Sequence, residues 1–358
     1  TQLFARDTAS LLAPVLDDQS FAILHLRMTS TQLEALTQEM LALVDKHAGK
    51  AGVEAIQNEL MEFNANAGKM LDSFEQAGAD TIYLVFSLQT LPGFLVVAPT
   101  HKHPDSLIQV MKQMSPQTKA KVLPGSGTSA LVVAGPASAV AQLSLNTPGS
   151  PKQLTTALAM CHDKSAVQCV LAPSPDLRSI VNQMLPQIPL GSGSIPLGRM
   201  VDNLQWMVAE LKASPQTALS ITTNSPNGRN ASLLNSDIQG LYTLLKQIPQ
   251  VRDMIPRIDA LFGHLTPIQQ DRRLSLKVDQ TTTEAIMKEV FAPSLVSMRK
   301  KLSQRACRTR VRGLGLAMLI YSNDYEDQFP LKLKDLRLAE VTEKGMRCPA
   351  VKTKDSYV

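Results

Sequence analysis

The sequence MRKKLSQRACRTRVRGLGLAMLIYSNDYEDQFP, residues 298–330, joins a basic helix start to an apolar helical run and a polar stop. The apolar residues cover most of a helical circumference, which predicts a largely buried helix: Leu314, Leu316, Ala317, Leu319, Ile320 and Tyr321. We expect the helix to end near Asn323, because residues 322–327 gather turn formers and Phe329-Pro330 favours extended backbone. A second short helix or turn is expected at residues 331–336.

The order of these residues resembles a known family. Cys307, an amphipathic helix, LAMLIYSND, an acidic turn, Phe329-Pro330 and finally Cys348-Pro349 resemble the region after the N-terminal helix of bacterial type IV pilin-like and type II secretion pseudopilin-like proteins, in the version abundant in planctomycete-type bacteria. The phrases ADTIYLVFSLQTLPG and AVQCVLAPSPDLRSIV also resemble large exported proteins of such bacteria that carry this tail. The resemblance implies location and architecture but brings no established activity. Filament assembly is not carried over, since the place of the apolar pilin helix is taken by residues 1–297.

Length and composition are compatible with two domains and a tail. The chain has 358 residues, of which 44% are hydrophobic and 19% charged, enough for one large core or two ordinary ones. Because it begins at Thr1 and stops mid-phrase at Val358, we expect both ends to be missing and a leader to precede Thr1. No run of eighteen apolar residues is present, so no transmembrane helix is expected in this range. We expect an exported protein, periplasmic or at the cell surface.

The hydrophobic pattern predicts an α+β fold of two related units, residues 1–150 and 151–297, followed by a basic helix and a truncated pilin-like module at residues 298–358. Each unit should have a mostly antiparallel sheet covered by helices on one face. The first unit is expected to contain strands at 19–28, 80–89, 93–99, 120–123 and 129–134, and helices at 31–46, 53–76, 104–114 and 136–145. The second is expected to contain strands at 166–173, 218–223 and 273–278, a flexible linker at 186–196, and helices at 174–185, 197–213, 231–247 and 281–305.

The positive charge of the chain is concentrated in one patch. The net charge is +5, yet seven cations and no acid lie between residues 299 and 312, so the remainder carries +5 − 7 = −2. The patch fits a solvated helix face or a site for an anionic partner, such as an acidic protein, lipid headgroups or a polyanionic glycan. Nucleic acid is not favoured, because no aromatic residues interleave with the cations. The patch consists of Arg299, Lys300, Lys301, Arg305, Arg308, Arg310 and Arg312.

The four cysteines have no C-x-x-C spacing, which argues against a zinc ribbon or thioredoxin-like site. Cys307 and Cys348 lie at the two edges of the pilin-like module, so we hypothesise a disulfide between them. Cys161 and Cys169 either pair across the turn that separates them or stay buried as thiols.

One metal site is considered. The acidic turn could hold calcium, because clustered carboxylate and carbonyl oxygens suit hard cations, although a solvated helix end explains the same residues: Asn323, Asp324, Glu326 and Asp327. The close pair His101 and His103 has no accompanying ligand and reads as a solvated loop. Phosphate-loop and nucleophile-elbow motifs are absent from the sequence.

These observations lead to three hypotheses. The first is a non-enzymatic exported structural or interaction protein that binds protein partners or itself within an envelope or extracellular assembly. The second is a periplasmic binding protein for a soluble ligand in a crevice between the two units, with residues 191–193 as the hinge. The third is a hydrolase whose catalytic groups lie on loops and leave no local motif.

Overall fold

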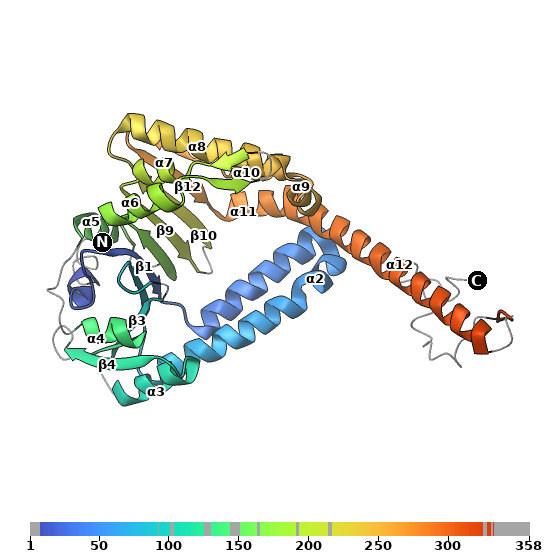
Figure 1. Cartoon of the computed structure of the whole chain (residues 1–358), viewed down its shortest axis with the longest axis horizontal. Coiled ribbons are helices and arrows are strands. Elements are labelled where there is room, and N and C mark those ends of the chain that lie inside the picture. The colour runs from blue at the N-terminus through green and yellow to red at the C-terminus, as the bar shows by residue number, and fades with distance from the viewer. Residues whose placement is uncertain are drawn as a thin grey trace.

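The computed structural model describes residues 8–91, 93–100, 104–124, 130–143, 151–162, 165–190, 193–213, 217–324, 328–330 and 332. For residues 51, 190, 296–303, 305 and 306 it describes the backbone alone. The protein has an α+β architecture in which one large antiparallel sheet carries helices, and a long helix projects from the body (Figure 1).

The sheet has ten strands in the order β11-β12-β10-β9-β6-β1-β2-β3-β5-β4. Strands β1 to β5 come from the first unit, and β6 with β9 to β12 come from the second. The two units therefore do not form separate sheets. Their first strands, β1 and β6, pair antiparallel in the middle, with Leu24 opposite Cys169.

Most of the first unit was predicted from its pattern. Its strands are β1 Ser20–Leu26, β2 Ile82–Ser87, β3 Leu95–Thr100, β4 Lys119–Pro124 and β5 Ala130–Gly135. Its helices are α2 Ser30–Gln76, α3 Pro104–Met114 and α4 Ala137–Gln142. Helix α2 is a hairpin of two arms, because Gly49 has a φ of 65° that L-residues rarely adopt.

The second unit repeats the order of strands with different connections. Its strands are β6 Val167–Leu171, β9 Trp206–Lys212, β10 Ala218–Asn224, β11 Ile268–Gln270 and β12 Arg273–Val278, with a separate two-stranded sheet of β7 Ile188–Leu190 and β8 Gly193–Ile195. Its helices are α5 Lys152–Leu158, α6 Pro175–Met184, α7 Leu197–Asp202, α8 Gly228–Gln247, α9 Pro249–Met254, α10 Ile258–His264 and α11 Gln280–Ile286. A π-helical turn, η1 Met287–Phe291, leads into α12 Ala292–Asp324.

Two predictions for the second unit were wrong. The expected flexible linker at 186–196 contains the paired strands β7 and β8, and residues 191 and 192 of the expected hinge lie outside the described residues. The expected helix at 197–213 is α7 followed by β9, in which Trp206, Val208 and Glu210 are buried in alternation. Burial that alternates every second residue is the pattern of a strand, and this segment is held as a strand because it pairs with β6 and β10.

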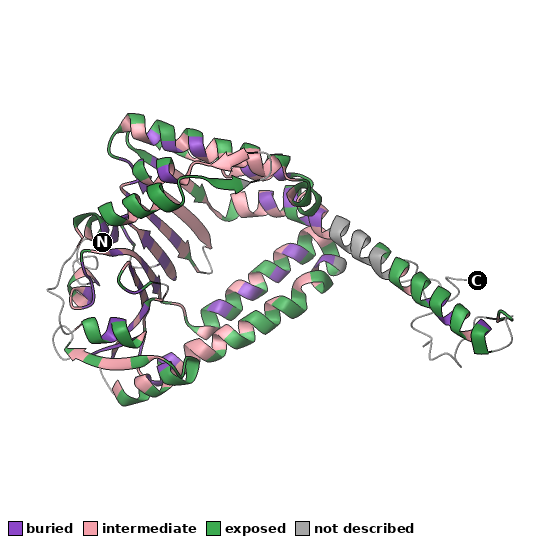
Figure 2. Ribbon diagram, viewed as in Figure 1, coloured by how far each residue is buried: buried purple, intermediate pink, exposed green. Residues whose placement is uncertain are grey.

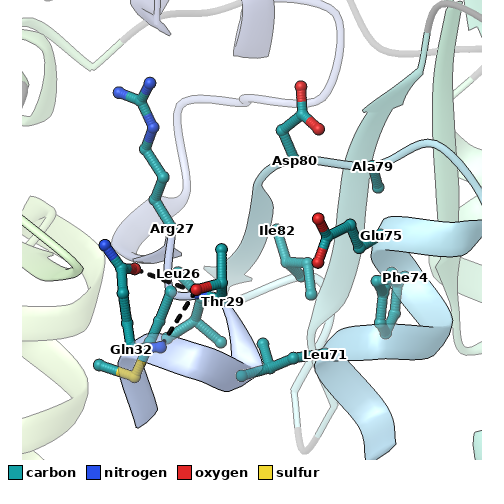
Figure 3. Close-up of a pocket in the computed structure, with 11 residues that line it drawn as sticks. Leu26, Arg27, Thr29, Gln32, Leu71, Phe74, Glu75, Ala79, Asp80 and Ile82 are labelled. Carbon is teal, nitrogen blue, oxygen red and sulfur yellow. Dashed lines mark hydrogen bonds between the residues drawn. The ribbon is translucent and has the colours of Figure 1, made fainter. Parts of the chain in front are cut away.

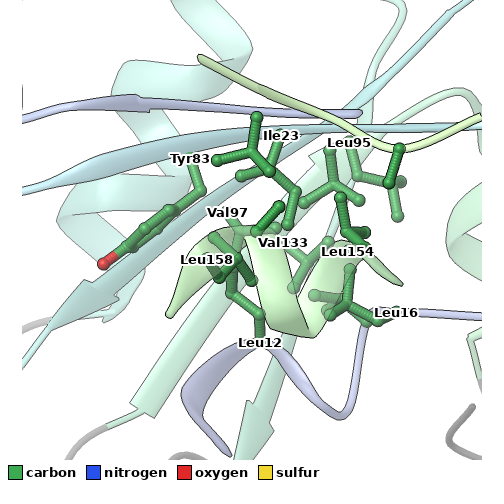
Figure 4. Close-up of a cluster of buried hydrophobic side chains, with 14 of the residues drawn as sticks. Leu12, Leu16, Ile23, Tyr83, Leu95, Val97, Val133, Leu154 and Leu158 are labelled. Carbon is green, nitrogen blue, oxygen red and sulfur yellow. The ribbon is translucent and has the colours of Figure 1, made fainter. Parts of the chain in front are cut away.

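The two faces of the sheet have different coverings, and we name them after the neighbouring residues Leu24 and His25. The His25 face carries the largest core, where α4, α5 and the N-terminal residues 8–16 pack on the central and first-unit strands (Figure 4). The Leu24 face is covered by α2 and α3 in the first unit and by α7 and α8 in the second. The first unit thus has helices on both faces, not on one as predicted.

Helix α12 departs from the prediction most clearly. It contacts the tip of α2 and η1 and then extends beyond the body (Figure 1). At the tip, Gly52 lets the two arms of α2 approach each other, because a Cβ at Gly52 would lie 2.5 Å from the Ala48 side chain. The expected burial of residues 314–321 was wrong: Leu314 and Ala317 are buried, whereas Leu316, Leu319 and Ile320 are exposed (Figure 2).

Candidate functional site

An apolar cavity of about 700 Å³ lies on the Leu24 face of the first unit. Its floor is the sheet, and its walls are the base of α2 and helix α3. The floor consists of Leu26, Ile82, Leu84, Val96 and Ala134, and the walls include Met70, Phe74, Met111 and Met114. Cavities of this size hold small molecules in many proteins.

Methionine gives this cavity its character. Three of the wall side chains are Met70, Met111 and Met114, and methionine is flexible and polarisable, so it adapts to apolar ligands of varied shape. Met111 is buried, while Met114 is 54% exposed and Phe94 is 39% exposed at the mouth. The cavity therefore has an apolar interior, and its lining at the surface combines Met114 and Phe94 with the polar residues Ser115 and Gln117.

A smaller, more polar pocket of about 320 Å³ adjoins this cavity at the base of the α2 hairpin (Figure 3). Leu26, Phe74 and Ile82 line both spaces. Figure 3 shows Arg27 and Asp80 extending away from the apolar side chains. The backbone here is fixed by a capping box at the start of α2, in which the Thr29 hydroxyl accepts from the Gln32 backbone N–H at 3.2 Å and the Gln32 amide oxygen accepts from the Thr29 N–H at 3.1 Å.

The second unit has a packed core on the same face of the sheet, at another position along its strands. Counting outward from the Leu24–Cys169 pair, the strand registers place Leu84, Val96 and Ala134 on one side and Ala209, Ile221 and Leu276 on the other. In the second unit, α7 and α8 pack on Leu171, Met207 and Leu274, which lie two residues along their strands from Cys169, Ala209 and Leu276. This core also contains Leu204, Ala231 and Leu234, with Met200 and Ile238 against it, whereas Ala209, Ile221 and Leu276 are half-buried. The difference arises between the first and second strand of each unit, where the first unit has the α2 hairpin that leaves the sheet and the second has α7 lying on it.

A row of polar side chains crosses the four central strands on the His25 face. The registers align Tyr83, His25, Gln168 and Glu210 from β2 to β9. His25 stacks on Tyr83 with ring centroids 4.5 Å apart and donates from Nδ1 to Gln168 Oε1 at 2.8 Å. Gln168 Nε2 donates in turn to Glu210 Oε1 at 3.4 Å and to the backbone carbonyl of His162.

The row ends in a buried carboxylate. Glu210 Oε1 accepts from the backbone N–H of His162 at 2.7 Å and from the Ser165 hydroxyl at 3.1 Å, and Glu210 Oε2 accepts from His162 Nδ1 at 2.7 Å. Burial lowers the pKa of His25 below its ordinary value; the hydrogen bond that His25 donates to Gln168 raises the pKa, and the charge of Arg27 lowers it further. The row joins β1 to β6 through the hydrogen bond between His25 and Gln168, which fits a cross-link between the units.

The calcium prediction is only partly covered by the structure. Asn323 and Asp324 are exposed at the end of α12, whereas Glu326 and Asp327 lie outside the described residues. Among the residues that the structure describes, no group of three or more His, Cys, Asp or Glu side chains is placed to hold a metal ion. His101 and His103 also lie outside the described part.

All seven cations of the predicted patch lie on α12. Of the four side chains at 299, 300, 301 and 305 nothing is described; Arg308 and Arg312 are exposed, and Arg310 is half-buried. For the hypothesised disulfide, Cys307 is half-buried on α12, and Cys348 lies outside the described residues. Cys161 and Cys169 are present as thiols, not as a pair, and burial raises the pKa of Cys161 to about 12, with Glu210 and Cys169 adding to the effect.

Comparisons of the chain with protein-family models, with curated proteins and with solved structures found no match. Within the described part of the chain, no helix combines the length and the apolar character needed to cross a membrane. The candidate site therefore rests on the geometry of this molecule alone.

Sequence reasoning missed the cavity. The high methionine content was a signal, but the three wall methionines come from α2 and α3, which are separated by two strands. Only the packing of both helices on one face of the sheet brings them together.

Proposed function

We propose that the protein binds a small apolar molecule in the first-unit cavity. The observation that carries this proposal is the cavity itself: an apolar space of about 700 Å³ whose floor includes Leu84 and Val96 and whose walls include three methionines. A protein interior is normally packed to crystal-like density, and an apolar space of this size lined by side chains costs stability unless it has a use.

Under this proposal the chain is a binding protein, but its ligand site lies in the first unit and not between the two units. The second of the three hypotheses from the sequence placed a soluble ligand in a crevice between two units, whereas β1 of the first unit pairs directly with β6 of the second. The cavity lies inside the first unit, and its lining selects for apolar surface. Apolar burial at about 25 cal/mol per Å² provides the binding free energy.

The test is a titration with the fluorescent apolar probe N-phenyl-1-naphthylamine. The parent protein should bind one probe molecule. Val96→Trp fills the floor of the cavity and should weaken binding at least about tenfold. Ile221→Trp is the matched control, because Ile221 occupies the position in β10 that Val96 occupies in β3, and it should leave binding unchanged.

A second variant guards against misfolding of the first. Met114→Trp lies at the exposed mouth, where the added ring is tolerated by the fold, and should also weaken binding. Circular dichroism shows whether each variant is folded. Equal binding by the parent, Val96→Trp and Met114→Trp would contradict the proposal.

A further inference from the structure

The projecting part of α12 presents large apolar side chains to solvent. Val311, Leu316, Leu319 and Ile320 are between 51% and 60% exposed. Isolated exposed apolar residues are common, but four within ten residues of one helix form a contiguous surface. This surface belongs to neither the cavity nor the sheet.

Two exposed arginines share the same side of the helix. Arg308, Arg312, Leu316 and Leu319 follow one another at spacings of four, four and three residues, which places them along one face. Among the described residues, neither Arg308 nor Arg312 has an acidic partner. Asp324 at the helix end lies roughly 140° around the axis from Leu319 and about 40° from Ile320, so it marks the outer end of this face.

The face therefore has cations at its inner end and apolar side chains at its outer end, and this order selects its partner. Two copies that met in parallel would bring their arginines together, and two that met antiparallel would press arginines onto leucines. An acidic protein would satisfy Arg308 and Arg312 but would set charge against Leu316 and Leu319. An anionic bilayer offers phosphates and acyl chains within a few ångströms of each other.

We infer that this face of α12, formed by Arg308, Arg312, Leu316, Leu319 and Ile320, docks on the surface of an anionic phospholipid membrane. The arginines lie at the headgroup phosphates, and the apolar side chains enter the boundary with the acyl chains. The helix lies on the membrane and does not cross it, and the inference is independent of the cavity and its ligand.

Co-sedimentation with vesicles tests the inference. The full chain should bind vesicles that contain roughly one third phosphatidylglycerol and bind pure phosphatidylcholine much more weakly. Arg308→Gln with Arg312→Gln should weaken binding about 25-fold, because each arginine near an anionic surface contributes about fivefold. Leu316→Asn with Leu319→Asn should weaken binding to a similar extent, and binding should fall at about 0.5 M salt.

Matched controls are available on the body of the protein. Arg229→Gln with Arg252→Gln removes the same charge from exposed positions on α8 and α9 and should leave vesicle binding unchanged. Met184→Asn removes an apolar side chain that is 75% exposed on α6 and should also have no effect.

Three outcomes would overturn the inference. The first is equal binding to neutral and anionic vesicles. The second is equal weakening by the control and test arginine pairs. The third is binding to polyglutamate at the salt concentration where anionic vesicles fail to bind, since that result would assign the face to an acidic protein.

Discussion

The two units of this protein build the same five-stranded arrangement and use it differently. In each, the first strand lies at the centre, the second and third follow outward, and the fifth lies inside the fourth. The first unit inserts a 47-residue helical hairpin after its first strand, while the second inserts α6, the β7–β8 hairpin and α7. The base of the α2 hairpin packs on the Leu24 face and its arms extend beyond the sheet, whereas α7 packs with α8 on that face. Each unit therefore has a core on this face, and the large apolar cavity lies beside the core of the first unit.

The largest expected effect distinguishes the two cores directly. Leu234→Ala removes a buried side chain from the filled core of the second unit and should lower the free energy of unfolding by about 3 kcal/mol. Met111→Ala removes a side chain of the same low exposure, but one that already borders empty space, so it loses fewer contacts and should cost about 1 kcal/mol. Urea denaturation measures both. Equal losses would mean that the first unit is packed as tightly as the second.

The polar row gives a second comparison, since Tyr83 and Glu210 flank the central pair His25–Gln168 from opposite sides. Glu210→Leu leaves the Ser165 hydroxyl and Gln168 amide without their carboxylate and should cost about 2 kcal/mol. Tyr83→Phe keeps the stacked ring and should cost about 1 kcal/mol or less. Thermal unfolding checks the order, and a larger loss for Tyr83→Phe would reverse the assignment of Glu210 as the anchor.

Acidification should weaken the junction between the units. The pKa of His25 in the folded chain lies below its ordinary value of 6.5. Between pH 6.5 and that lower pKa, His25 is therefore protonated in the unfolded chain and neutral in the folded chain. The free energy of unfolding should therefore fall as the pH drops from 6.5 toward the lower folded pKa. His25→Gln, which gives the row two equivalent glutamines, should reduce that fall. Unfolding curves at pH 7.5 and 5.5 measure it; an unchanged fall in the variant would exclude His25 as its source.

The smallest expected effect concerns the boundary of the cavity toward the second unit, where Cys169 lies. Cys169 continues the floor beyond Leu84 and Leu24 but does not line the cavity. Saturation with the apolar probe should leave the rate of Cys169 alkylation by iodoacetamide unchanged, as followed by mass spectrometry at pH 8. Buried Cys161, with a pKa of about 12, should react more slowly and serves as the internal reference. Protection of Cys169 would show that the ligand reaches the second unit.

The sequence was informative about elements and poor about assembly. Local pattern predicted the α+β class, the α2 arms and the hairpin from β2 to β3, because alternation and turn residues act within a few positions. It misassigned residues 206–212 as helix, since their neighbours β6 and β10 supply the pairing that makes them a strand. It also predicted a buried helix at 314–321, because apolar composition indicates which residues favour burial but not what covers them.

The candidate site could not be predicted from local sequence pattern, because that pattern does not show which elements pack together. Met70, Met111 and Val96 come from three elements, and their common cavity exists only once the ten-stranded sheet has formed. The basic patch was visible in the sequence, whereas its shared face with Leu316 and Leu319 depends on α12 continuing straight beyond the body.

The most direct test of the central claim is a crystal structure of the protein equilibrated with xenon under pressure. Apolar cavities that exclude water take up xenon. The account predicts xenon density between Met70, Met111 and Val96 and none in the core around Leu204, Leu234 and Leu274. Helix α3 closed onto the sheet with no xenon in the first unit, or xenon held equally in both units, would contradict it.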